Sequence, residues 1–420
     1  MNTQIGFMSP FFGLSAVNFF LADVQDGLGP FLAAWLAQTA HWDPARIGIV
    51  MTISGIAGLV FNAPAGGLID RLGTPRFLLA AASLAVVAGT LGLLASHAFI
   101  PVLVTQIVVA IGGAFMAPGL AALTLDMVGK GGFPARQGRN QAWNHGGNVA
   151  AGLAVAGATY VTGPTSAFWV MAGMAAGSMG SLLLIPRSAI RAEGRDEGSQ
   201  KDGSQKDGSQ KDGSQKDGSL RAILTDRRVV AVGIALCAFH LGNAAMLPML
   251  GQRMAAIGKG DPTRWLAACV IIAQLTMIPV ALFAGRMADR VNRAWLLVAA
   301  CMVLPVRGVM AALATDPVWL IPVQMLDGCG AGTLGVVVPL LAADYTWGSG
   351  KTQTALGAVG TAQGVGASLS ATVGGVLATQ FGWEAAFLGL AVPAALSLAL
   401  SLRLAGQAPS LKAASIKARV

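Results

Sequence analysis

The sequence predicts an all-α membrane protein with twelve transmembrane helices, arranged as two pseudo-symmetric six-helix bundles. Composition, long apolar runs and an internal repeat support this prediction. Of 420 residues, 54% are hydrophobic and only 11% are charged, whereas about 25% are charged in soluble domains. Apolar runs of about 20 residues recur, and each can cross a bilayer core of about 30 Å. The 55 glycines fit helices that pack closely in lipid.

The apolar runs delimit twelve expected spans. The first six are 10–36, 46–68, 76–96, 99–124, 138–162 and 165–186, and the last six are 228–252, 264–287, 294–314, 317–343, 352–380 and 385–405. The first run lacks a basic leader and a small-residue cleavage site, so we expect a span and not a removed signal. The four cysteines fall inside spans without the spacing of metal ligands, so no metal or cofactor is expected.

A polar repeat, GSQKDGSQKDGSQKDGSQKDGS, separates the two groups of spans. It has too few apolar residues to fold, and its Lys and Asp residues balance in charge, which argues against nucleic-acid binding. The expected domains are an N-terminal bundle at 1–186, a disordered cytoplasmic linker at 187–227, a C-terminal bundle at 228–405 and a cytoplasmic tail at 406–420.

Basic residues predict the orientation of the spans. The loops on one side carry only Arg46, Arg253, Lys259 and Arg264, and the loops on the other side carry far more basic residues, even without the linker. Because positive loops stay inside, both termini are expected to be cytoplasmic.

The two groups of spans repeat each other at a nearly constant offset. Four matches are 218 residues apart: Pro30 and Pro248, Gln106 and Gln324, Asp126 and Asp344, and His145 and Gln363. A fifth match, between the loops GGLIDRLGTPR and AGRMADRVNR, has an offset of 219. A common register at five places predicts two related halves, a plan typical of transporters in which one half rocks against the other.

These two loops share the pattern G-x-x-x-D-R, which resembles the signature loop of the major facilitator superfamily. The resemblance covers the chain apart from the linker and tails, and it implies a cytoplasmic latch between the halves. The latch residues it implies are Gly66, Asp70, Arg71, Gly73 and Arg76, then Gly285, Asp289, Arg290 and Arg293. Asn292 stands where a glycine is usual. Asp70 lies at an expected helix end, where it could hydrogen-bond a neighbouring helix N-terminus; a plain helix-ending turn is the alternative.

Two carboxylates, Asp23 and Asp26, interrupt the first span in NFFLADVQDGLGPF. At helical pitch they share an arc with Asn18, Gln25 and Pro30, and an ionised acid facing lipid would cost at least ~2.5–3.5 kcal/mol. We therefore expect this arc to face the protein or a wet cavity. Two acids so close cannot both ionise cheaply, so one should hold a proton. The prediction is proton coupling by Asp26 with Asp23, with Asp327 as the next candidate; a single acid that caps a helix break is the alternative.

Other polar residues in the spans are expected to line a substrate cavity, which in the resembled family lies among spans one, four, seven and ten. They are Gln25, Gln106, Asn144, His145, Asn148, His240, Asn243 and Gln324. For the asparagines, hydrogen bonding between helices is the alternative, and for His240 it is a core position. Arg307 and Asp327 lie about 12 and 15 Å from the turn between spans nine and ten, so they could form an ion pair, either structural or functional.

Together these features predict a secondary transporter that moves a small solute by alternating access. We expect it in a bacterial inner membrane, as a monomer, with a small-molecule substrate, protons and the lipid bilayer as partners. No Walker loop is present, so the chain itself is not expected to hydrolyse ATP. A membrane enzyme and a non-transporting receptor or scaffold are the alternatives outside transport.

Proton-coupled export of a small organic or toxic compound is the leading hypothesis. Proton-coupled uptake of a small solute, such as a siderophore or an organic acid, is the second. Drug–proton antiporters of the resembled family usually carry an arginine in span four and a proline in span five. This sequence has neither, so the resemblance does not name a cargo.

Overall fold

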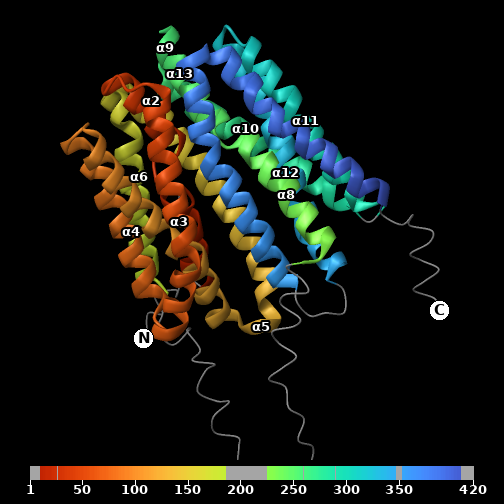
Figure 1. The fold of residues 1–420 in the computed structure, drawn as a ribbon. Coiled ribbons are helices and arrows are strands. Elements are labelled where there is room, and N and C mark those ends of the chain that lie inside the picture. Colours follow the sequence, from red (N-terminus) through yellow and green to blue (C-terminus); the bar gives the residue numbers. More distant parts are fainter. Residues whose placement is uncertain are drawn as a thin grey trace, which may run out of the picture. The chain divides into compact units, whose positions relative to one another are not determined.

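The computed structural model describes residues 10–25, 27–185, 225–258, 260–288, 290–346 and 352–407. The linker repeat, Asp26 and Asp289 lie outside these residues, and so does the side chain of Asp70. Every long element in Figure 1 is a helix. The helices of the first half are α1 (Pro10–Val24), α2 (Pro30–Thr39), α3 (Pro44–Leu72), α4 (Pro75–Gly92), α5 (Phe99–Thr162) and α6 (Ser166–Leu183). Those of the second are α8 (Arg227–Asn243), α9 (Met246–Ile257), α10 (Pro262–Ala288), α11 (Arg293–Leu313), α12 (Leu320–Tyr345) and α13 (Thr352–Gln407).

Two of these helices are long enough to cross a membrane twice. Within α5 the backbone leaves the helical region at Gly129 (φ 66°), and within α13 it does so at Gly382 (φ 84°). Glycine suits both places, because a side chain disfavours positive φ. Among the described residues, nine helical stretches are long and apolar enough to span a membrane, and Phe11–Val24 is a shorter apolar helix. The protein is therefore a multi-pass integral membrane protein.

Span one is broken, as the alternative of a helix break there foresaw, whereas span seven is interrupted only at Ala244 and Ala245, whose backbone stays in the right-handed helical region. The helix α1 ends at Val24, and α2 begins at Pro30 after two glycines with positive φ, Gly27 and Gly29. The helix α8 ends at Asn243, and α9 begins at Met246. The polar arc expected along span one therefore does not continue through Gln25, which lies in the turn.

The chain divides into two compact units. One comprises residues 1–29 and 57–211, and the other comprises residues 30–56 and 212–420. In the first unit α1 packs against α5 and α6, and α4 packs against α5. In the second unit α8 packs along α13, α10 packs against α12, and α11 lies between α12 and α13. Each unit has its own core of buried aliphatic and aromatic side chains.

The two units repeat the same close helix contact. In the first, Gly147 of α5 lies so near the carbonyl of Phe19 in α1 that a side chain would collide with it. In the second, Gly366 of α13 lies in the same way against the carbonyl of Cys237 in α8. These pairs are 219 and 218 residues apart, the register of the internal repeat in the sequence. Packing within the units thus follows the repeat.

Candidate functional site

A buried polar cluster lies at the centre of the second unit, where α8, α11 and α12 meet. Arg307 of α11 has 1% of its side chain exposed, and its Nη1 lies 2.9 Å from Oδ1 of Asp327 on α12. The same nitrogen donates to Oδ1 of Asn243 at the end of α8. Nδ2 of Asn243 in turn donates to Oδ1 of Asp327 over 3.2 Å. The three side chains thus form a closed triangle.

The members of this triangle differ in exposure. The Asp327 side chain keeps 20% of its surface exposed, whereas Arg307 is enclosed. Asn243 is the last residue of α8, and the C-terminus of a helix carries partial negative charge that favours a nearby cation. The carboxylate is therefore the more exposed of the two charges, and it balances the enclosed guanidinium.

The cluster leaves several buried polar atoms without a partner. Among the described residues, Nε and Nη2 of Arg307 have no hydrogen-bond acceptor, and neither amide atom of Gln324 has a partner. Gln324 is fully buried and lies one helical turn before Asp327 on α12. Buried polar groups are normally hydrogen-bonded, so unpaired groups in a native fold call for an explanation.

Two further side chains border the cluster. His240 lies one turn before Asn243 on α8, and its Nδ1 is 2.9 Å from the carbonyl oxygen of Leu236. It is close enough to interact electrostatically with Asp327. Cys269 of α10 is 1% exposed and lies near both Arg307 and Asp327. Burial of Arg307 strengthens the interaction between the two charges.

The first unit has no such charges at the matching positions. At the repeat offset of 218, Arg307, Asp327 and Asn243 correspond to Gly89, Val109 and Gln25. A side chain on Gly89 would reach within 2.8 Å of the Val109 side chain, so these two positions also face each other. The fold therefore forms this helix contact with small and apolar residues in one half and with an ion pair in the other.

The other residues expected to line a cavity in the first half lie in the first unit. Gln106 is buried at 9% exposure, whereas Gln25 is exposed in the turn after α1. Asn144, His145 and Asn148 are half-buried on α5. Asp23 is half-buried near the end of α1, and Asp26 is not described, so the structure gives no geometry for the expected acid pair.

Sequence reasoning missed Arg136, which organises a polar network in the first unit. It donates to the Asn140 side chain over 3.0 Å, to Ser15 Oγ over 2.7 Å and to the Phe11 carbonyl over 3.1 Å. Asn140 in turn donates to Thr124 over 2.9 Å and is 1% exposed. The i, i+4 spacing of Arg136 and Asn140 was the available signal. This network joins α1 to both parts of α5, so Asn140 acts in helix packing.

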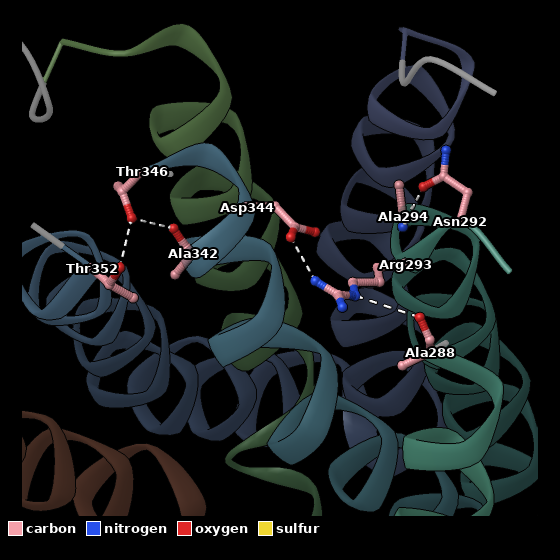
Figure 2. Close-up of polar contacts among 8 residues, drawn as sticks. All are labelled: Ala288, Asn292, Arg293, Ala294, Ala342, Asp344, Thr346 and Thr352. Atoms are coloured by element: carbon pink, nitrogen blue, oxygen red, sulfur yellow. Dashed lines mark hydrogen bonds and ion pairs between the residues drawn. The ribbon is translucent and has the colours of Figure 1, made fainter. Parts of the chain in front are cut away.

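Figure 2 shows polar contacts beside the second copy of the G-x-x-x-D-R loop, which the resemblance implies as a latch. Arg293 at the start of α11 forms an ion pair with Asp344 near the end of α12, with Nη1 and Oδ1 2.5 Å apart. Its Nε donates to the Ala288 carbonyl over 3.4 Å. Asn292 caps α11 by accepting from the Ala294 amide over 3.0 Å. Asn292, in place of the usual glycine, thus has a local role as a helix cap.

The other latch residues lie at helix ends. In the first copy, Arg76 donates to the Leu182 carbonyl of α6, and Gly73 has φ +58°, which ends α3. Arg71 and Arg290 are exposed, and Gly66 and Gly285 are half-buried. Asp289 and the side chain of Asp70 lie outside the described residues, so the expected contacts of these two carboxylates stay predictions.

The described residues form helices in repeated units, with a broken first span and a charge pair inside one unit, an arrangement typical of multi-pass membrane transporters. A profile of the Major Facilitator Superfamily matches residues 12–345 and 232–419. Uncharacterized MFS-type transporters from two strains of Mycobacterium tuberculosis, CDC 1551 / Oshkosh and H37Rv, are each 38% identical over 380 residues, covering 90% of this chain and 88% of theirs. The chain belongs to the Major Facilitator Superfamily.

Solved structures with a similar fold are also transporters. The nucleoside transporter NupG has a TM-score of 0.74 at 13% identity, with 96% of this chain and 100% of that chain covered. A bacterial homolog to the human lysosomal transporter Spinster has a TM-score of 0.69 at 13% identity, with 96% and 98% covered. At such identities the likeness concerns the fold alone. Family and fold together make this protein an MFS-type secondary transporter and not an enzyme.

Proposed function

We propose that this protein couples the movement of a small organic solute to protons, with Asp327 as the proton-carrying group and Arg307 as its switchable partner. The observation that carries the proposal is the triangle of Arg307, Asp327 and Asn243 inside the second unit. Ionisable residues within transmembrane segments are costly, and they typically mark proton relays or substrate paths.

The internal repeat supports a functional role for the ion pair. Gly89 and Val109 hold the matching helix contact without charge in the first unit. Stability alone gives no reason for the charges in the second unit, because replacing a buried ion pair with apolar residues is often neutral or stabilising. Since the matching contact forms without charge in the first unit, we attribute the pair in the second unit to what its charges do.

Asp327 can couple a proton to a change in the pair. While Asp327 is ionised, it neutralises Arg307 and holds it against Asn243. When Asp327 takes up a proton, Arg307 loses its counter-ion and must find another negative partner or move. Asn243 lies at the short interruption between α8 and α9. Discontinuous helices commonly form the central site of transporters.

Two kinds of coupling fit this pair. A cationic cargo would compete with the proton for Asp327, which gives antiport and, with an inward proton gradient, export. An anionic cargo would replace Asp327 beside Arg307 and travel with the proton, which gives symport and uptake. Export is the leading hypothesis from the acids of span one, whereas the unpartnered edge of Arg307 favours uptake of an anion.

The proposal also covers the membrane location, the orientation of the termini, the oligomeric state and the domains. We infer an inner-membrane location with both termini cytoplasmic from the distribution of basic residues, and a monomer from the family plan. The expected domains at 1–186 and 228–405, joined by the linker at 187–227, form part of the same proposal. Asp23 and Asp26 stay candidates for a second proton site.

Proton movement in proteoliposomes tests the proposal. Compounds that stabilise the purified protein against heat would be added outside vesicles that enclose a pH-sensitive dye. We expect at least one compound to drive a pH change with the wild-type protein, with acidification for symport and alkalinisation for antiport. Asp327→Asn should abolish the pH change. Glu384→Gln, which changes an exposed acid on α13, should keep most of it. Solute movement without any proton movement in the wild type would overturn the proposal.

A further inference from the structure

Among the described residues, the Arg307 guanidinium makes its polar contacts through Nη1, on one side of the group. Its Nη1 is shared between Asp327 and Asn243, whereas Nε and Nη2 have no partner among the described residues. The Nε–H bond and one Nη2–H bond run nearly parallel along the same edge of a planar guanidinium. Two parallel donors of this kind match the two oxygens of a carboxylate. Arg307 therefore presents an intact bidentate edge inside the second unit.

Gln324 also has polar atoms without a hydrogen-bond partner among the described residues, and it lies at a similar distance along its helix from the turn between α11 and α12. Counted from the turn between α11 and α12, Gln324, Arg307 and Asp327 lie about 6, 9 and 11 Å along their helices. Since α11 and α12 pack together, Arg307 lies between the levels of Gln324 and Asp327. The Gln324 side chain is 0% exposed, and both its oxygen and its nitrogen lack a partner in the described part of the chain. Its amide can donate to an anion and accept from a hydroxyl.

We infer that this place binds the carboxylate of a small organic anion, held side-on by Nε and Nη2 of Arg307, with the Gln324 amide as its neighbour. The inference rests on the proposed transport site at Asp327 and names the class of cargo that the site takes. The unsatisfied donors supply the reason, because a buried donor without a partner is destabilising and a bidentate anion satisfies both donors together. A neutral oxygen acceptor would pair with the Arg307 edge more weakly than a carboxylate, because it lacks the negative charge.

Binding of the anion and protonation of Asp327 support each other. With Asp327 ionised, Arg307 is already neutralised, and a second carboxylate would be repelled by the first. Once Asp327 is protonated, the incoming carboxylate restores charge balance around Arg307. Proton and anion therefore bind cooperatively, and reciprocity requires each to raise the affinity for the other. The resulting coupling is symport.

Paired ligands test the inference on the full purified chain. The probes are aliphatic, aromatic and dicarboxylic acids, each with its primary amide, together with chloride and inorganic phosphate, scored by the thermal unfolding temperature. We expect at least one carboxylate to stabilise the protein while its amide does not. For acids that stay ionised throughout, the affinity should rise as pH falls, by up to about tenfold per pH unit for one linked proton.

Variants assign the binding to the proposed atoms. Arg307→Lys keeps a positive charge but lacks the bidentate edge, so it should weaken carboxylate binding at least about tenfold. Gln324→Leu should weaken it several-fold. Asp327→Asn should make it independent of pH. Two buried residues of α9 serve as controls: Arg253→Lys, whose Nη1 donates to the carbonyls of Ala311 and Ala312, and Gln252→Leu. Both should bind as the wild type does.

The possible outcomes separate the carboxylate site from the proposed proton coupling. If no carboxylate binds more tightly than its amide, or if binding survives Arg307→Lys unchanged, the carboxylate site is wrong. If chloride or phosphate stabilises the protein as well as any organic acid does, the site takes inorganic anions and the inference also falls. In either case proton movement with a cation in vesicles would leave the proposed function standing. Conversely, carboxylate binding without any proton movement would refute the coupling and keep the site.

Discussion

Arg307 and Asp327 meet in the interior of a membrane-spanning unit, where an unpaired charge of either sign is expensive. Removing one partner from a buried pair costs about 3–5 kcal/mol, because the other charge stays behind without compensation. Removing both partners has no such cost. This asymmetry separates a pair kept for stability from a pair kept for its chemistry.

A comparison of single and double variants uses this asymmetry. Asp327→Leu alone should lower the free energy of unfolding by about 3–5 kcal/mol, since Arg307 then lacks a counter-ion. Arg307→Met combined with Asp327→Leu imitates the apolar contact of Gly89 and Val109 and should recover to within about 1 kcal/mol of the wild type, or exceed it. The double variant should nevertheless show no transport. Unfolding in detergent and flux in vesicles measure the two properties. A double variant as unstable as the single one would show that the pair serves the fold.

At the scale of helices, hydropathy predicts the spans but not where a span is broken. The break after Val24 is indicated instead by Gly27, Gly29 and Pro30, which suit a turn. Residue counting from a turn places Arg307 and Asp327 at similar depths, because helical rise is regular. The third member, Asn243, could not be assigned to them, since its position depends on how α8 packs against two helices distant in sequence.

The close contact of α13 with α8 gives a prediction at this scale. Gly366→Ala would place a methyl group on the Cys237 carbonyl, so we expect a loss of about 1–3 kcal/mol from overpacking. Gly357→Ala, in the same helix with open space around it, should change stability by less than about 1 kcal/mol. Thermal unfolding of both variants measures the difference. Equal effects would mean that the two helices do not approach so closely at Gly366.

The latch loops give a second prediction at this scale. We expect Asp70→Asn to slow flux while leaving cargo affinity within a few-fold, because a latch changes the balance of conformational states by ~1–3 kcal/mol. Asp43→Asn, at the opposite end of α3, removes an acid that accepts from the Arg46 amide and should affect flux less. Initial rates and equilibrium binding should be measured side by side. A large loss of affinity with normal rates would contradict the latch role.

At the scale of the whole molecule, the internal repeat is the feature that sequence alone reveals most securely. The offset of 218 residues recurs in glycine contacts that no composition argument could locate. The functional difference between the halves is harder to see. The repeat aligns Asp327 with Val109 and Arg307 with Gly89, so the sequence already shows charged residues in one half and uncharged residues in the other. Only the packing of the helices shows that these positions face each other.

The linker gives a prediction that concerns the whole chain. Because residues 198–219 are polar and repetitive, shortening them to about half should preserve expression and transport. Each halving of a flexible loop changes its closure entropy by only about 0.6 kcal/mol. Expression level and flux per inserted protein are the measurements. Loss of transport in a well-inserted shortened variant would assign the repeat a role.

The central claim is that Asp327 carries the proton while Arg307 holds the cargo, and one comparison tests it most directly. A labelled carboxylate that binds the wild-type protein is followed in two vesicle assays, namely accumulation driven by an inward proton gradient and exchange at equal pH. The wild type should do both. Asp327→Asn should still exchange the label, because Arg307 remains, but should no longer accumulate it. If Asp327→Asn still concentrates the label with a proton gradient, the proton carrier lies elsewhere and the account is wrong.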